Sequence, residues 1–181
     1  LTVDQDFAPP EWIDPMLART ENVGGELTLL ATTDTRQTND AAVDGDGGTL
    51  LAPIDLLRAK QWGHGIGAHP NTAGLNDPKQ AARAIALHTE RLQDHAPRVV
   101  RHHYLRWWGH DAPVQDLANL GYWMELNFVS LAPEMRGPGF QSGSGRPQRW
   151  QLPSGELLPI FSQPTQVEDD VIGGDLDYCL L

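Results

Sequence analysis

The first residues that could carry out chemistry are two aspartates near the start of the chain. Asp4 and Asp6 lie two positions apart in the stretch 1–7, whose apolar residues are typical of a β-strand. Alternate side chains of a strand point to the same face, so the two carboxylates would project side by side. Such a pair is costly to bury unless a divalent cation binds one carboxylate and leaves the other as a general base. Two surface acids on an edge strand would give the same pattern.

Histidines are the next candidates. His69 ends the glycine-rich stretch 65–69, where small residues let the backbone approach closely. Imidazole is the commonest metal ligand in proteins, although a single histidine at a strand end is also often structural. His88 falls on the apolar face of an expected helix, and His64 and His95 fall at helix ends, where a cationic side chain favours the helix dipole. We interpret these three as structural.

A dense polar cluster follows a later apolar strand. Alternation sends Arg101 and His103 to one face of the chain and His102 to the other. An ion pair between Arg101 and Asp4 would fix the orientation of the carboxylate, or would be an interior pair without a catalytic role.

The adjacent tryptophans Trp107 and Trp108 would suit stacking against a sugar ring or simple packing under a loop. Other catalytic patterns are missing. Residues 139–145 are rich in glycine but lack the Gly-Lys-Ser/Thr of a P-loop, and no Gly-x-Ser-x-Gly is present. The sequence therefore gives no support to a phosphate-binding loop or to a serine nucleophile.

The composition fits one ordinary globular domain. A net charge of -11 over 181 residues argues against a nucleic-acid-binding surface, and no run of eighteen apolar residues could span a bilayer. The single cysteine, Cys179, excludes an intramolecular disulfide, which is compatible with a cytoplasmic protein, and no signal peptide is visible. We expect one domain over residues 1–167 and an acidic tail over 168–181.

The elements that must position these residues alternate between strand and helix. Such alternation predicts an α/β fold with a mainly parallel sheet, whose strand ends would bring the polar residues together. The expected strands are 1–7, 26–32, 65–69, 98–101 and 123–130, followed by a hairpin over 148–162. The expected helices are 11–20, 53–62, 77–95 and 113–120.

In order and spacing, these segments resemble the polysaccharide deacetylase family of carbohydrate esterases, which includes chitin and peptidoglycan deacetylases. Three stretches are similar to the family's motifs for the aspartates, for a metal-binding histidine and for the arginine that contacts the catalytic aspartate: Thr2-Val3-Asp4-Gln5-Asp6, Gly63-His64-Gly65-Ile66-Gly67-Ala68-His69 and Val100-Arg101-His102-His103-Tyr104. The resemblance covers about residues 1–130 and implies a distorted (β/α) barrel of mainly parallel strands.

The sequence departs from that family at the metal ligands. Ala73 stands where a second metal-binding histidine normally follows, and no histidine follows His110 to act as the usual general acid. His102 and His103 replace the two prolines of the third motif. Because His103 shares the face of the arginine, it could replace the missing ligand. The predicted metal ligands are Asp6, His69 and His103.

The resemblance implies a metal-dependent hydrolase that removes N- or O-acetyl groups from a carbohydrate. It implies Asp4 as the base, oriented by Arg101, and a backbone N–H near Tyr104 at the oxyanion. One divalent metal ion, expected to be zinc, would polarise the acyl group, and Trp107 and Trp108 would contact the acetylated carbohydrate. Two alternatives remain: a carbohydrate-binding relative with impaired catalysis, and a metal-dependent hydrolase of another amide.

Overall fold

The predicted alternation of strands and helices is present in the computed structural model. The structure describes residues 2–5, 8, 10–32, 53–72, 75, 77–95, 97–105, 107–128 and 146–165. The strands are β1 (Thr2–Asp4), β2 (Thr28–Ala31), β3 (Gly65–Ala68), β4 (Val99–Val100), β5 (Met124–Glu125), β6 (Gln148–Gln151) and β7 (Leu157–Ser162). The helices are α1 (Pro10–Asn22), α2 (Pro53–Gln61), α3 (Pro78–Arg91) and α4 (Ala112–Asn119), with 3₁₀ turns η1 (Gln93–His95) and η2 (His103–Leu105).

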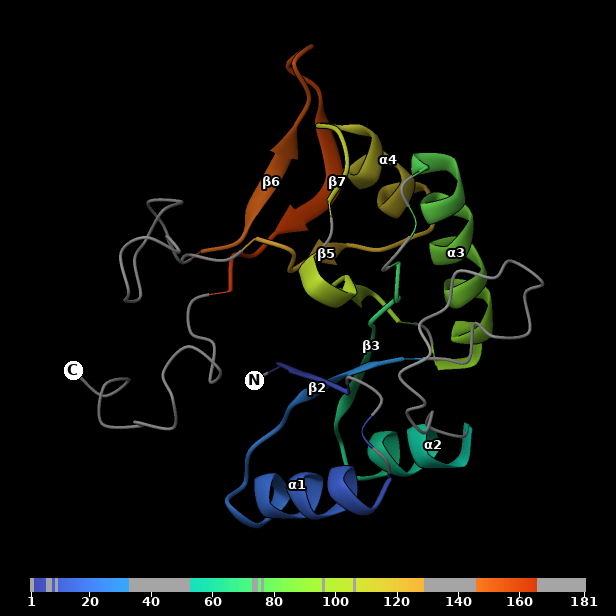
Figure 1. Cartoon of the computed structure of the whole chain (residues 1–181). Coiled ribbons are helices and arrows are strands. Elements are labelled where there is room, and N and C mark those ends of the chain that lie inside the picture. The colour runs from blue at the N-terminus through green and yellow to red at the C-terminus, as the bar shows by residue number, and fades with distance from the viewer. Residues whose placement is uncertain are drawn as a thin grey trace, which may run out of the picture.

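The strands form one sheet that winds in a single direction. Their order is β1-β2-β3-β4-β5-β7-β6, and every pairing is parallel except that of β6 with β7. Each crossover from β1 to β5 leads to the next strand in the same direction across the sheet. Because such crossovers are right-handed, their helices lie on the same face of the sheet. Figure 1 shows α1, α2, α3 and α4 following one another around one side of the strands. This winding is typical of a barrel, whereas the strand order of an open doubly wound sheet reverses.

The sheet is strongly curved. At the usual strand spacing, β1 and β4 would lie about 14 Å apart in a flat sheet, which exceeds the length of an arginine side chain. Yet Arg101, directly after β4, donates hydrogen bonds to Thr2 in β1 and to Thr165 beyond β7, both at 3.1 Å. The two sides of the sheet therefore curl toward one another. The fold is the predicted α/β arrangement and is consistent with a distorted barrel.

Strand alternation divides the buried residues between the two faces of the sheet. The face toward the helices is apolar and carries the main core, which includes Leu29, Ala31, Ile66, Ala68, Val100 and Ile160. The inner face carries Thr2, Asp4 and Arg101. Helix residues complete the core, among them Leu17, Ile85 and Leu117. The inner face also carries the buried Leu30, and its polar groups come together near the strand ends.

A glycine on the inner face of β3 is required by close packing. Gly67 pairs with Leu30, and a Cβ atom at Gly67 would lie 2.3 Å from Leu30 Cδ2 and 2.9 Å from the carbonyl oxygen of Val99. The Val99 contact is with backbone, which cannot simply rotate away. The expected close approach at this glycine-rich strand is confirmed.

Gly67→Ala is therefore expected to lower the free energy of unfolding by about 1–3 kcal/mol, the usual range for overpacking. Gly65→Ala is the matched control, because its Cβ would meet the Thr28 side chain at 3.0 Å rather than backbone. Urea denaturation of both variants measures the difference. Equal losses would contradict the role assigned to the Val99 carbonyl.

Helix ends follow their predicted signals. The Asp77 side chain accepts a hydrogen bond from the Lys79 N–H at 3.0 Å, and Gly63 and Gly121 have φ values of 86° and 87° after the ends of α2 and α4. Helix α1 is longer than expected and keeps Pro15 inside it. Strand β5 is shorter than the predicted 123–130. The predicted tail over 168–181 lies outside the described residues.

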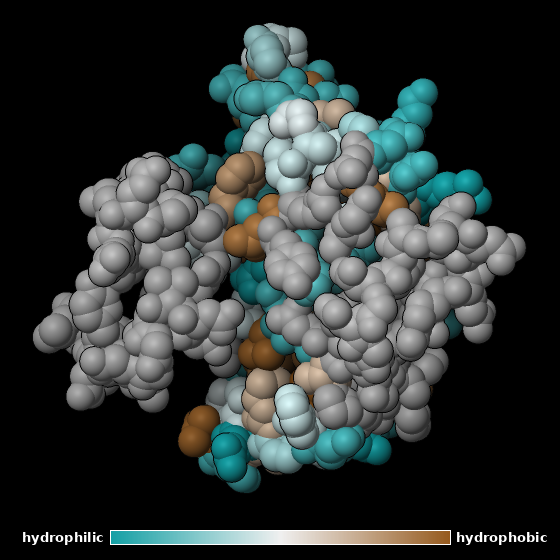
Figure 2. All heavy atoms as spheres, viewed as in Figure 1, coloured by the Kyte–Doolittle hydropathy of each residue, from teal (hydrophilic) through white to brown (hydrophobic). Residues whose placement is uncertain are grey.

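None of the described helices combines the length and the apolar character needed to cross a bilayer. On the face shown in Figure 2, hydrophobic side chains occur in small groups among polar ones. Isolated exposed hydrophobic residues of this kind are ordinary in folded proteins.

Candidate active site

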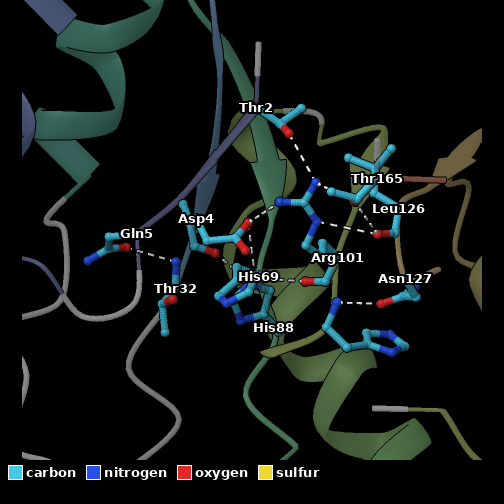
Figure 3. Close-up of polar contacts among 12 residues, drawn as sticks. Thr2, Asp4, Gln5, Thr32, His69, His88, Arg101, Leu126, Asn127 and Thr165 are labelled. Carbon is cyan, nitrogen blue, oxygen red and sulfur yellow. Dashed lines mark hydrogen bonds and ion pairs between the residues drawn. The ribbon is translucent and has the colours of Figure 1, made fainter. Parts of the chain in front are cut away.

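Arg101 lies at the centre of the polar cluster on the inner face (Figure 3). Its Nη1 donates to Asp4 Oδ1 at 3.0 Å, and its Nη2 donates to the hydroxyls of Thr2 and Thr165. Its Nε donates to the carbonyl oxygen of Leu126 at 3.3 Å. The predicted ion pair between Arg101 and Asp4 is therefore present. Because its other donors are engaged as well, the guanidinium holds the carboxylate in one orientation.

His69 lies beside this pair, immediately after β3. Its Nδ1 is 2.9 Å from the carbonyl oxygen of Arg101 and 3.7 Å from Asp4 Oδ1. A carbonyl oxygen can only accept, so Nδ1 donates this hydrogen bond. Metal-binding histidines commonly donate their other ring nitrogen in this way.

His103 approaches His69 from the turn after β4. The two rings lie 5.4 Å apart, centroid to centroid, at 76° to one another. His103 Nδ1 is 3.3 Å from Asn71 Oδ1, an oxygen that accepts. Asn71 therefore contacts the imidazole in this structure and holds it at one ring nitrogen. The structure brings together His69 and His103, two of the three predicted metal ligands.

The third predicted ligand, Asp6, lies outside the described residues. Its neighbour Gln5 is fully buried, and its side chain accepts from the Thr32 N–H at 2.8 Å and donates to the Ala8 carbonyl at 3.3 Å. Gln5 thus fixes the backbone that leads from β1. Within the described part of the chain, no three His, Cys, Asp or Glu side chains gather as they would around a metal ion. Of the three predicted metal ligands, the described residues therefore include two, His69 and His103.

The histidines that the sequence indicated as structural lie away from solvent among backbone groups. His88 in α3 donates from Nε2 to the Ala31 carbonyl at 3.0 Å, and burial lowers its pKa to about 3. Burial also lowers the pKa of His95. His64 accepts the Leu27 N–H at Nδ1 at 3.4 Å. This buried contact is consistent with the structural role expected for His64.

The turn that carries His103 is tight. Leu105 in η2 has a φ of 51°, a value that residues with a side chain rarely adopt, and its N–H donates to the His102 carbonyl at 2.8 Å. Uncommon backbone conformations often occur at functional sites. Tyr104 belongs to the same turn, but its side chain lies outside the described part of the structure, so its assigned role stays a prediction.

The two tryptophans belong to a larger aromatic cluster. Trp108 stacks on His102 at 5.5 Å, and Trp107 lies 5.3 Å from Phe128 and 5.7 Å from Trp150, between ring centroids. Sequence reasoning missed Phe128, which follows β5, and Trp150, which lies in β6, because neither belongs to the tryptophan pair's own segment. It also missed the threonines that hold the arginine. Thr2 shares the face of Asp4, so alternation could have found it.

Comparison with known proteins supports the fold and little beyond it. No protein-family model and no curated protein matches the chain. A solved structure from Bordetella bronchiseptica, provisionally assigned as a polysaccharide deacetylase involved in O-antigen biosynthesis, matches with a TM-score of 0.56 and 19% identity. The match covers 94% of this chain but 58% of that protein. At this identity the similarity establishes a polysaccharide-deacetylase-like fold.

Proposed function

We propose that the chain is a metal-dependent hydrolase that removes acetyl groups from a carbohydrate. The observation that carries this proposal is the contact of the Asp4–Arg101 pair with His69 at the carboxyl ends of β1, β3 and β4. Ligand sites of barrel proteins lie at these strand ends. The deacetylase-like fold is consistent with the proposal.

Asp4 is the general base in this mechanism. Arg101 orients its carboxylate through the hydrogen bond from Nη1, and Asp4 remains partly open, with 23% of its side chain exposed. The carboxylate accepts a proton from water as that water attacks the acyl carbon. The bond from the acyl carbon to the sugar nitrogen or oxygen then breaks, which gives acetate and a free amine or hydroxyl.

His69 and His103 would hold one divalent metal ion together with Asp6, and zinc suits such nitrogen and oxygen ligands. When bound, the ion supplies a Lewis acid that acidifies water and polarises the acyl oxygen. The chain's own part is to fix both imidazoles through the Arg101 carbonyl and Asn71. Such outer contacts orient ligating rings.

The leaving group needs a proton donor if it is an amine. Of the histidines considered for this step, His102 is fully buried and stacks on Trp108, and His103 is assigned to the metal. His110 is exposed and pairs with Asp111 through Nδ1. His110 is therefore the histidine that we propose as the acid. The half-buried Trp107 and Trp108 are proposed to contact the sugar.

Metal binding tests the ligand assignment directly. We expect His69→Ala and His103→Ala each to weaken zinc binding by about 10–100-fold, measured by isothermal titration calorimetry. The matched control, His110→Ala, removes an exposed histidine and should leave zinc affinity unchanged. Unaltered zinc binding in His103→Ala would remove that residue from the ligand set.

Acetate release from acetylated chitooligosaccharides, with and without added zinc or cobalt, tests the activity. We expect release that depends on the metal and that falls by at least about 10²-fold in Asp4→Asn, the magnitude typical of losing a general base. A well-folded, metal-loaded protein that releases no acetate from N- or O-acetylated sugars would argue against the hydrolase.

One observation favours a second candidate, a carbohydrate-binding protein without catalysis. The sequence has Ala73 where a second metal-binding histidine normally follows in the family it resembles, and no histidine after His110 to act as the usual acid. If the protein only binds carbohydrate, an NMR titration should show that the acetylated oligosaccharide binds. No acetate should then be released, even at saturating metal. Binding together with turnover would exclude it.

A further inference from the structure

A buried carboxyl group lies behind the site, on the opposite face of the sheet. Glu125 in β5 pairs with Val100, whose side chain belongs to the core beneath the helices. Glu125 is fully buried, and apart from the neighbouring Ser162 side chain its Oε1 meets no hydrogen-bond donor among the described residues. A buried acid of this kind is uncommon, and the deacetylation mechanism above does not use it.

The other oxygen of Glu125 orients one amide side chain. Oε2 accepts the backbone N–H of Asn127 at 2.8 Å and its side-chain Nδ2 at 3.1 Å. With its amino group held this way, Asn127 presents Oδ1 to the backbone N–H of His102 at 2.6 Å. Asn127 is itself buried. A continuous hydrogen-bonded path therefore runs from Glu125 to the main chain of the turn after β4.

That turn carries two residues of the proposed site. His102 lies between Arg101 and His103, so fixing its N–H fixes the backbone from which both side chains project. On the inner face, the neighbouring Leu126 carbonyl accepts from Arg101 Nε. Residues 125–127 thus contact the turn twice. The Leu126 carbonyl binds the side chain of Arg101, and Asn127 binds the backbone N–H of His102.

We propose that Glu125 is a positioning residue, which sets the places of Arg101 and His103 through the amide of Asn127. Its importance for catalysis rests on the proposed function, whereas the positioning itself does not. Burial raises the pKa of Glu125, and the Ser162 side chain and the Asn127 amides offset part of this effect. Glutamine matches the shape of the glutamate and can still accept from Asn127, so it is the conservative replacement.

Hydrogen exchange of the His102 amide, followed by NMR, tests the proposal without any need for activity. We expect Glu125→Leu to accelerate exchange at His102 by about tenfold or more, and Glu125→Gln to stay close to the wild type. The amide of Leu30 in β2, remote from the path, serves as an internal reference and should not change. Zinc affinity should fall in Glu125→Leu and be retained in Glu125→Gln.

Unchanged exchange at His102 in Glu125→Leu would overturn the proposal, as would equal effects of the leucine and glutamine variants. If Glu125→Leu does not fold, Asn127→Ala takes its place, because it removes the link and keeps the carboxyl; slow exchange at His102 in that variant would overturn the proposal. If exchange responds as expected but no acetate is ever released, the deacetylase assignment fails and the positioning role stands.

Discussion

Replacing Arg101 with methionine is expected to lower the free energy of unfolding by about 3 kcal/mol, the lower end of the range for breaking a buried ion pair. Only 11% of the Arg101 side chain is exposed, and its loss leaves Asp4, with 23% exposed, without its cationic partner. The same change removes the hydrogen bonds to Thr2 and Thr165 that draw the two sides of the curved sheet together. Urea denaturation followed by circular dichroism measures the loss.

The chain offers a matched control in the ion pair of Arg58 with Asp14. Its side chains are 38% and 34% exposed, and a surface pair of this kind contributes at most about 1 kcal/mol. Arg58→Met should therefore cost far less than the change at the central arginine. The double variant Arg101→Met/Asp4→Leu should recover part of the loss, because no unpaired carboxylate remains. Equal costs at the two arginines would show that the central pair is not structurally important.

Acid is expected to destabilise the fold through His88. Burial above all, and also the nearby His69, lowers the His88 pKa from 6.5 to about 3. The unfolded chain binds a proton at this residue below pH 6.5, whereas the folded chain resists it until about pH 3. The stability contributed by the neutral ring is therefore complete above pH 6.5 and is lost as the pH falls toward 3, by a total on the order of 5 kcal/mol.

His88→Gln tests this expectation, because glutamine can donate to the Ala31 carbonyl but does not titrate. Its free energy of unfolding should fall less steeply between pH 6 and pH 4 than that of the wild type, by up to about 1.4 kcal/mol per pH unit. His110→Gln, at an exposed position, is the control and should follow the wild type. Parallel pH profiles for His88→Gln and the wild type would mean that His88 is not the residue that resists protonation.

The fold followed from the sequence where the signals were local. The Asp77 cap and the glycines after α2 and α4 mark helix ends through backbone chemistry that a few neighbouring residues decide. Alternation placed Arg101 and His103 on one face of their segment, and the opposite charges of Arg101 and Asp4 allowed their pairing to be predicted. Strand β5 was overestimated because the pattern of 123–130 reports burial, whereas a strand also needs a partner along its whole length.

Contacts between distant segments could not be found in this way. Thr165 reaches Arg101 across 64 positions, and Asn127 reaches the His102 backbone across 25. Nothing in the local sequence of either residue indicates such a partner. The partner of His64 is likewise distant, because its Nδ1 accepts the Leu27 N–H across 37 positions. The ligand role of Asp6 stays a prediction, since that residue lies outside the described part of the chain.

The reach of Arg101 also bears on how the protein is made. Its partner Asp4 precedes it by 97 positions, and Thr165 follows it by 64, so the guanidinium joins early, middle and late parts of the chain. Closing such long loops costs entropy and slows folding. During synthesis the arginine cannot be fully satisfied until Thr165 has left the ribosome. The full set of contacts that orients Asp4 through Arg101 can therefore form only after Thr165 has been synthesised.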